Sequence, residues 1–222
     1  STTAYGFHPD NQVPLTEDSP LRGNADFTYA KNKRELEHIC ASFQESHPDI
    51  DMIIVRPCFV VGPGIDNPLS HHLKKKIVLM PAQTAPFQYI HEDDLVEIIH
   101  LLLKAKKRGA YNLAADGLMT FDEMIKMLGN WPLKLPFFLM YPLNNIAWLL
   151  RLKILTEFPS AGLNMVVYPW YASNEKIKNE LGYRFTYTTQ EAFADFTRCV
   201  HEEEPSGLSW FISRLTNRPS RR

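Results

Sequence analysis

Residues 26–37 read Asp26-Phe27-Thr28-Tyr29-Ala30-Lys31-Asn32-Lys33-Arg34-Glu35-Leu36-Glu37, a pattern typical of the beginning of a helix. Tyr29 and Lys33 stand four residues apart, so their side chains lie one above the other on the same helix face. A neighbouring ammonium group favours the phenolate and lowers the pKa of tyrosine from its ordinary value of about 10. Such a phenol can give or take a proton during catalysis. Taken alone, the pair also fits a plain helical tyrosine beside a solvated lysine.

Four further segments accompany this pair in a fixed order. They are Ser1-Thr2-Thr3-Ala4-Tyr5-Gly6, Ile53-Ile54-Val55-Arg56-Pro57-Cys58-Phe59-Val60-Val61-Gly62-Pro63-Gly64, Phe87-Gln88-Tyr89-Ile90-His91-Glu92-Asp93-Asp94 and Tyr111-Asn112-Leu113-Ala114. Together the segments resemble the extended short-chain dehydrogenase/reductase family, in its NAD-dependent epimerase/dehydratase group. The resemblance runs from residue 1 to about residue 196. It implies an α/β fold: the C-terminal part of a Rossmann-type doubly wound sheet, with a smaller mixed substrate domain drawn from residues 62–87 and 119–187.

The resemblance also implies an active site and a cofactor. Tyr29 would be the general acid/base on a substrate oxygen, Lys33 would lower its pKa and bind the nicotinamide ribose, and Ser1 would orient the substrate oxygen. A short segment would lie against the nicotinamide ring and bind the cofactor, namely Pro57, Cys58, Phe59 and Val60. The expected cofactor is NAD or NADP. The expected reaction is oxidoreduction or epimerisation at a secondary alcohol or ketone of a small molecule.

Four residues are expected on the substrate side. Thr2 and Thr3 stand where dehydratases of the family carry an acidic pair, and neither threonine can serve as acid or base in eliminating water. Phe87 stands where nucleotide-sugar epimerases carry an arginine, and an aromatic ring cannot bind a diphosphate as a guanidinium does. His71 falls in a segment that borders the substrate pocket in relatives. These residues favour a sugar derivative or an apolar small molecule as the substrate.

The 222 residues contain no glycine-rich GxxGxxG loop, which in this family approaches the cofactor pyrophosphate at a helix N-terminus. We therefore expect the chain to be the C-terminal part of a longer protein and to need the remainder for activity. A natural short form that no longer binds the dinucleotide is the alternative. A second hypothesis for function is a non-catalytic, dinucleotide-responsive or interaction protein on the same fold.

Composition sets broad limits on function. The chain is 45% hydrophobic and 22% charged, which is ordinary for a globular protein. A formal net charge of −1 gives no indication of nucleic-acid binding. The three cysteines, Cys40, Cys58 and Cys199, lack metal-ligand spacing and are typical of reduced thiols in a cytoplasmic protein. No metal site is predicted.

Local patterns predict the main elements. Residues 1–6 should form the end of a buried strand and a turn, and residues 51–55 a buried strand. A helix should run from about Thr28 to Ser46, with an apolar face made by Leu36, Ile39, Cys40 and Phe43. Residues 87–90 should form a strand, and the acidic residues after it should cap a helix that ends near Lys107 rather than act in catalysis. Thr120 and Glu123 form a capping-box pattern before another helix.

Three surface questions remain open in the sequence. The heavily apolar stretch Pro136–Leu155 could be a core helix of the substrate domain, the wall of an apolar substrate pocket or a surface that touches a membrane. The core helix is the favoured reading and membrane contact the least favoured. Residues 205–222 form a basic tail. Relatives often dimerise through the helix that carries Tyr29 and Lys33, so a homodimer is expected.

Overall fold

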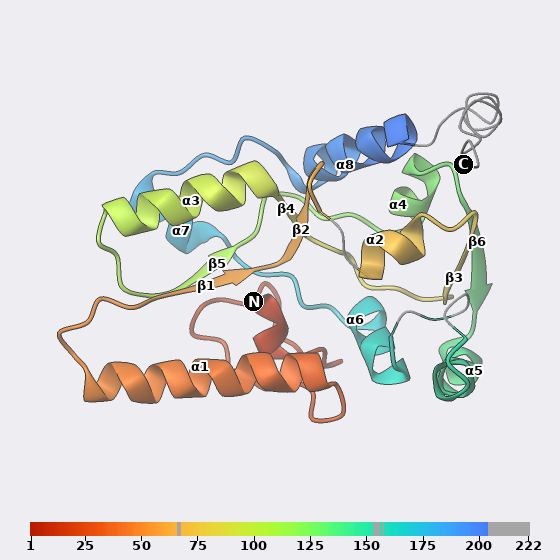
Figure 1. Ribbon diagram of the computed structural model, residues 1–222, viewed down its shortest axis with the longest axis horizontal. Helices are drawn as coiled ribbons and strands as arrows, with labels where there is room; N and C mark the ends of the chain where they lie inside the picture. The colour runs from red at the N-terminus through yellow and green to blue at the C-terminus, as the bar shows by residue number, and fades with distance from the viewer. Residues whose placement is uncertain (66–67, 153–155, 157, 204–222) are drawn as a thin grey trace, which may run out of the picture.

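A computed structural model describes residues 1–65, 68–152, 156 and 158–203 (Figure 1). The elements follow in this order: η1 (Thr2–Tyr5), α1 (Thr28–Ser46), β1 (Ile53–Pro57), β2 (Phe59–Val61), α2 (Pro68–Leu73), β3 (Ile77–Pro81), β4 (Tyr89–His91), α3 (Glu92–Lys104), β5 (Gly109–Leu113), α4 (Phe121–Met127), β6 (Trp131–Leu135), α5 (Phe137–Leu149), η2 (Ser160–Leu163), α6 (Asn164–Val167), α7 (Glu175–Leu181) and α8 (Thr189–Glu203).

The strands pair in parallel, as the sequence predicted for this fold class. β1 pairs with β5, β2 with β4 and β3 with β6. Figure 1 shows α1 on one side of the β1–β5 pair and α3 with α7 on the other, while α8 covers β4. Helices on both faces of parallel strands are the arrangement of a doubly wound α/β fold. The predicted Rossmann-type α/β class is therefore confirmed.

Apolar side chains bury themselves between these layers in separate clusters, because removing them from water is the main drive to fold. One cluster lies between β1, β5, α3 and α7 and includes Ile98, Leu102 and Ile177. A second joins β3, β4, α4 and α8 and includes Phe121 and Phe193. A third cluster packs η1 and the start of α1 against α6 and against Trp170 and Ala172, which follow α6. This third cluster supports the candidate site.

Several boundaries differ from the sequence prediction. Residues 1–6 hold a short 3₁₀ helix instead of a strand end, because the Ser1 hydroxyl accepts a hydrogen bond from the Thr3 amide and caps a helical turn. β1 starts two residues later than expected and keeps Arg56 and Pro57 within the strand. α3 ends at Lys104, and Lys106 beyond it adopts a left-handed φ of 49°. The capping box at Thr120 and Glu123 is present as predicted.

The predicted apolar face of α1 does not face the core. Leu36, Ile39 and Phe43 are 50%, 66% and 40% exposed. The helix instead buries Ala30 and Glu37. The prediction of a helix here is confirmed. The face that α1 buries differs from its predicted apolar face, because Glu37 pairs with a buried arginine on β1.

The core-helix interpretation of the apolar stretch is also wrong. α5 occupies Phe137–Leu149 and buries Met140, Asn144 and Ala147, while Phe138 and Leu149 are 74% and 79% exposed. Residues 153–155 at the end of this stretch, and the predicted basic tail at 205–222, lie outside the described residues. Within the ranges that the structure describes, no helix is both long and apolar enough to cross a membrane.

Candidate active site

The predicted catalytic Ser1 lies beside the carboxyl end of β1, where parallel α/β folds place their sites. Its nitrogen donates to the Val55 carbonyl at 3.3 Å, and its hydroxyl oxygen accepts a hydrogen bond from the Thr3 hydroxyl at 3.0 Å. The neighbouring Thr2 hydroxyl donates to the Pro57 carbonyl at 3.2 Å. These bonds fix η1 against the strand and hold the Ser1 side chain in one orientation.

Tyr29 and Lys33 lie together on the first turns of α1, as their spacing predicts. The Lys33 ammonium nitrogen is 5.4 Å from the centre of the Tyr29 ring, within the range of a cation–π contact. Tyr29 is 51% exposed, so its phenol is open to a ligand. The helix that carries this pair packs against η1, the short helix that directly follows Ser1.

A buried ion pair positions the helix that carries these groups. Glu37 follows Lys33 by one more helical turn and is 6% exposed, and Arg56 on β1 is equally buried. The Arg56 Nε donates to both Glu37 carboxylate oxygens at 2.9 Å, and Nη2 donates to Oε2 at 2.6 Å. This forked geometry is the strongest form of a carboxylate–guanidinium contact, and it locks α1 to β1 at the turn beside Lys33.

The same arginine extends the network to η1. Its Nη1 donates to the Tyr5 hydroxyl at 2.7 Å, and that hydroxyl donates to Asn112 Oδ1 on β5, also at 2.7 Å. Burial raises the pKa of Tyr5 to about 12, although Arg56 opposes the shift. Tyr5 therefore stays protonated and serves as a structural bridge. Sequence reasoning missed this network, because its members lie far apart in the chain and share no spacing pattern.

The predicted cofactor segment runs from the last residue of β1 into β2. The Cys58 amide donates to the Leu113 carbonyl at 3.0 Å, and the Pro57 carbonyl already accepts from Thr2. Cys58 is buried, and burial raises the pKa of its thiol well above the ordinary range, so it is not a nucleophile. Phe59 and Val60 belong to β2 and pair with β4. The Cys58 amide and the Pro57 carbonyl thus already have partners within the chain.

The predicted substrate residues separate into two groups. Thr2 and Thr3 lie with Ser1 on η1. Phe87 is 1% exposed and lies inside an aromatic cluster, with ring centres 5.7 Å from Phe59 and 5.4 Å from Phe121. It reaches the predicted cofactor segment through Phe59, but it is enclosed by core side chains. His71 is exposed on α2, a separate element.

The acidic residues at the start of α3 make structural contacts. Asp94 is buried and accepts hydrogen bonds from the Tyr183 hydroxyl at 2.6 Å and from the Thr186 amide at 2.9 Å. Glu92 accepts from the Gly64 amide at 2.9 Å. These contacts support a structural role over a catalytic one, but the acids do not cap α3 as predicted, because the His91 side chain accepts the cap bond from the Asp93 amide at 3.1 Å. The described residues contain no group of three or more His, Cys, Asp or Glu side chains arranged to hold a metal ion.

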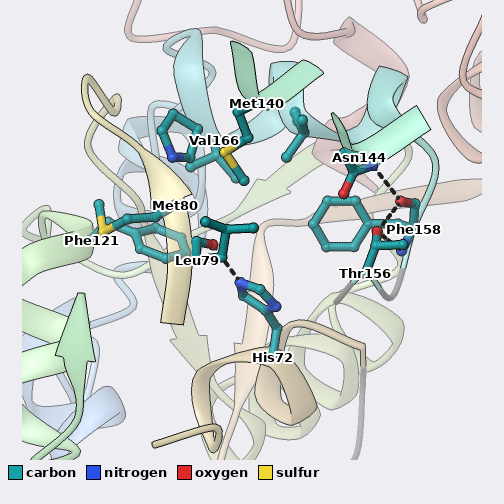
Figure 2. Close-up of a pocket in the computed structure, with 11 residues that line it drawn as sticks. His72, Leu79, Met80, Phe121, Met140, Asn144, Thr156, Phe158 and Val166 are labelled. Carbon is teal, nitrogen blue, oxygen red and sulfur yellow. Dashed lines mark hydrogen bonds between the residues drawn. The ribbon is translucent and has the colours of Figure 1, made fainter. Parts of the chain in front are cut away.

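A small cavity lies between β3, α4, α5 and η2, and none of the residues that line it belongs to the predicted site (Figure 2). Its walls include Met80, Phe121, Met140, Asn144 and Phe158. The space measures only about 10 Å³ for a water-sized sphere, about the room for one water molecule. It is therefore too small to be a substrate pocket.

Comparison with known proteins identifies the class. Residues 1–114 match the model of the NAD dependent epimerase/dehydratase family. This is just over half of the chain, and it includes η1, the Tyr29–Lys33 pair and the strands beside them. The protein belongs to the NAD dependent epimerase/dehydratase family, which confirms the family resemblance.

Curated relatives match most of the chain. An uncharacterized protein of Mycobacterium tuberculosis and one of Mycobacterium bovis are each 29% identical over 199 residues, which is 89% of this chain and 52% of theirs. The chain therefore spans about half the length of the curated relatives that it matches.

Solved structures resemble the chain at low sequence identity. A Bacillus anthracis dTDP-glucose 4,6-dehydratase in complex with NAD has a TM-score of 0.67 at 16% identity, covering 92% of this chain and 60% of its own. A Bifidobacterium longum UDP-glucose 4-epimerase in complex with NAD⁺ and UDP has a TM-score of 0.66 at 21% identity, covering 93% and 63%. RMD from Pseudomonas aeruginosa, complexed with NADPH, has a TM-score of 0.63 at 14% identity, covering 91% and 64%. At this identity the likeness establishes the shared fold.

Proposed function

We propose that the whole protein is an NAD(P)-dependent oxidoreductase or epimerase acting on a secondary alcohol or ketone, and that this chain carries its acid/base residues. The observation that supports the proposal is that Tyr29 and Lys33 lie together at the start of α1, and that α1 packs against η1, which Ser1 precedes beside β1. Family membership and neighbours crystallised with NAD or NADPH support the same class and cofactor. The substrate would be a sugar derivative or an apolar small molecule.

In this proposal each residue has one task. The Tyr29 hydroxyl gives a proton to, or takes one from, the substrate oxygen. Lys33 stabilises the phenolate form by its positive charge and binds the nicotinamide ribose. The Ser1 hydroxyl, oriented by its hydrogen bond from Thr3, donates to the substrate oxygen. The nicotinamide, when bound, would exchange a hydride with the substrate carbon.

Two buried residues would hold the catalytic groups at their proper distances. The Glu37–Arg56 pair fixes the distance between α1 and β1, and with it the distance between Tyr29 and Ser1. Positioning of this kind matters because a misplacement of about 1 Å can cost about a hundredfold in rate. Glu37 and Arg56 would therefore act as positioning residues, with no contact to the substrate.

The first test measures cofactor binding and turnover in the whole protein. Calorimetry with NAD and NADP should show binding of one of them, and a panel of sugar derivatives and apolar secondary alcohols should then be screened for nicotinamide reduction. With a substrate in hand, Tyr29→Phe should lower kcat by about 10²–10⁴-fold, because the general acid/base is lost. Lys33→Met should lower it as well, whereas Lys31→Met, a matched lysine on the exposed side of α1, should not.

Two results would overturn the proposal. If Tyr29→Phe retains full activity, the phenol is not the acid/base. If the whole protein binds neither NAD nor NADP, the alternative of a non-catalytic interaction protein on this fold takes its place.

We also propose that the protein forms a homodimer through the outward face of α1. This face places Leu36, Ile39 and Phe43 in solvent in the single chain, which is a costly arrangement for apolar groups. Sedimentation of the whole protein measures the oligomeric state directly, and a monomer at micromolar concentration would contradict the proposal.

A further inference from the structure

α5 differs from an ordinary surface helix because its large apolar side chains face solvent instead of the core. Its buried positions, Met140, Asn144 and Ala147, recur at intervals of four and three residues and so form one face. Two of these three side chains are small or polar. The remaining faces carry large apolar side chains, which we call the α5 surface: Phe138, Leu139, Leu143, Ile146, Leu149 and Leu150, each between 45% and 79% exposed.

Specific hydrogen bonds fix this orientation. Asn144 Nδ2 donates to the Phe158 carbonyl at 3.1 Å and to the Ser160 hydroxyl at 3.2 Å, and Figure 2 shows this side chain pointing inward toward Phe158. The Ser160 hydroxyl in turn donates to the Tyr141 carbonyl at 2.8 Å. Rotating α5 to bury its leucines would break these bonds and leave the Phe158 carbonyl and the Ser160 hydroxyl without this donor. The outward direction of the α5 surface is thus built into the fold.

The apolar exposure continues into the preceding strand. β6 leads into α5 through Pro136, and its side chains Trp131 and Leu133 are 75% and 51% exposed. Trp148 on α5 is 45% exposed. Tryptophan favours the boundary between water and lipid, because its ring is apolar and its N–H needs a polar partner.

The stretch that carries these exposed apolar side chains contains no acidic residue, although Asp122 on α4 pairs with its lysine. Residues 131–152 contain Lys134 and Arg151 and no aspartate or glutamate. Arg151 follows the C-terminal end of α5 and is exposed, while Lys134 is bound by Asp122 at 2.7 Å. A large apolar surface with a cation at its end and no acid within it complements an anionic lipid surface.

The length of α5 decides how it could meet lipid. Thirteen residues extend about 20 Å, whereas crossing the apolar part of a bilayer takes about 20 residues. An apolar helix of this length can lie in the plane of the interface with its outer face among the lipid chains.

We propose that the α5 surface docks the protein on an anionic lipid bilayer, with α5 parallel to the membrane plane and Arg151 at the lipid headgroups. Docking on lipid accounts for two features: the absence of acidic residues from 131–152, and the hydrogen bonds that hold Asn144 on the inward face of α5. Membrane contact, the least favoured of the three interpretations of this stretch from its sequence, therefore becomes the preferred one.

The test is co-flotation of the whole protein with vesicles of equal parts phosphatidylglycerol and phosphatidylcholine, compared with vesicles of phosphatidylcholine alone. The wild type should float with the anionic vesicles and more weakly with the neutral ones. The variant Phe138→Gln/Leu149→Gln should bind at least tenfold more weakly, because two large apolar contacts with lipid are lost. Arg151→Gln should reduce binding severalfold and remove the preference for anionic lipid.

The matched control is Val96→Gln/Leu103→Gln on α3, where the two side chains are 67% and 63% exposed on another part of the molecule. This variant should float like the wild type. Equal loss of binding in both double variants, or no flotation of the wild type, would overturn the proposal. Conversion of a wild-type oligomer to monomer by Phe138→Gln/Leu149→Gln, without any vesicle binding, would overturn it too and assign the α5 surface to a second copy.

Discussion

Helices α1 and α5 both turn large apolar side chains outward, yet their outward faces differ in charge. On α1, Ile39 and Phe43 are interspersed with charged residues such as Lys31 and Glu35, which pair at 3.9 Å. On α5, no charged residue occurs from Phe137 to Leu149. A helix that is apolar nearly all round belongs in a core or against lipid, whereas a mixed face is compatible with a protein partner and with water. The two exposed faces therefore suit different occupants.

The inward faces differ in a parallel way. α1 is held by the charged Glu37, which is paired with Arg56, and α5 by the neutral Asn144. Breaking a buried ion pair strands a charge, whereas breaking a neutral hydrogen bond strands only a dipole. The comparison thus predicts unequal costs for removing the two anchors.

The largest expected effect is on the α1 anchor. Glu37→Ala should lower the free energy of unfolding by about 3–5 kcal/mol, because it leaves the Arg56 guanidinium buried without its carboxylate. Urea denaturation measures this loss. Glu35→Ala, on an exposed surface pair two residues away, should change stability by less than about 0.5 kcal/mol. The double variant Glu37→Leu/Arg56→Met should recover most of the loss, and no recovery would mean that the pair is not the anchor.

The α1 anchor should also respond to pH. The pKa of Tyr5 lies at about 12 in the folded protein, above its ordinary value of 10.0. Between these pH values the unfolded chain has released the tyrosine proton and the folded chain still holds it, so stability is complete below pH 10 and falls as pH rises toward 12. The fall is on the order of 2.5 kcal/mol.

Unfolding free energies measured from pH 9 to 12 test this fall. Tyr5→Phe should remove part of it, whereas Asn144→Ala should leave the slope unchanged because the α5 anchor has no titratable group. An unchanged slope in Tyr5→Phe would show that this tyrosine does not couple α1 to pH.

The α5 anchor should cost less to break. Asn144→Ala should lower the free energy of unfolding by about 2 kcal/mol, since the Phe158 carbonyl and the Ser160 hydroxyl lose a buried donor. Asn145→Ala, an exposed neighbour, should stay within about 0.5 kcal/mol of the wild type. A loss as large as that of Glu37→Ala would contradict the distinction between charged and neutral anchors.

Local patterns in the sequence located helices along the chain, but they did not predict which face of α1 or of α5 is buried. The spacing of Tyr29 and Lys33 located α1, and the capping pattern at Thr120 located α4, because both depend on contacts within a few residues. The inward turn of Glu37 depends on Arg56, nineteen residues away and on a strand. The inward turn of Asn144 likewise depends on Ser160, in a segment without regular pattern. Periodicity marks an apolar face, but it does not say what covers that face.

The candidate site shows the same limit. Ser1, Tyr29 and Lys33 were predictable because each falls in a short motif, and the roles assigned to them stay predictions. The Arg56–Tyr5–Asn112 network was not predictable, because its members come from β1, η1 and β5. Long-range polar bonds of this kind leave no spacing rule in the chain.

The smallest expected effects concern the outward faces themselves. Ile39→Gln on α1 and Leu149→Gln on α5 should each change the unfolding free energy of the single chain by less than about 0.5 kcal/mol, because side chains that are 66% and 79% exposed contribute little to the core. Their effects on association should diverge: Ile39→Gln should weaken the proposed dimer in sedimentation experiments and leave vesicle binding intact, and Leu149→Gln should do the reverse. If both variants weakened dimerisation, or both weakened vesicle binding, the difference in charge between the two faces would not determine what each face binds. The exposure of apolar side chains on α1 and α5 would then have a common cause.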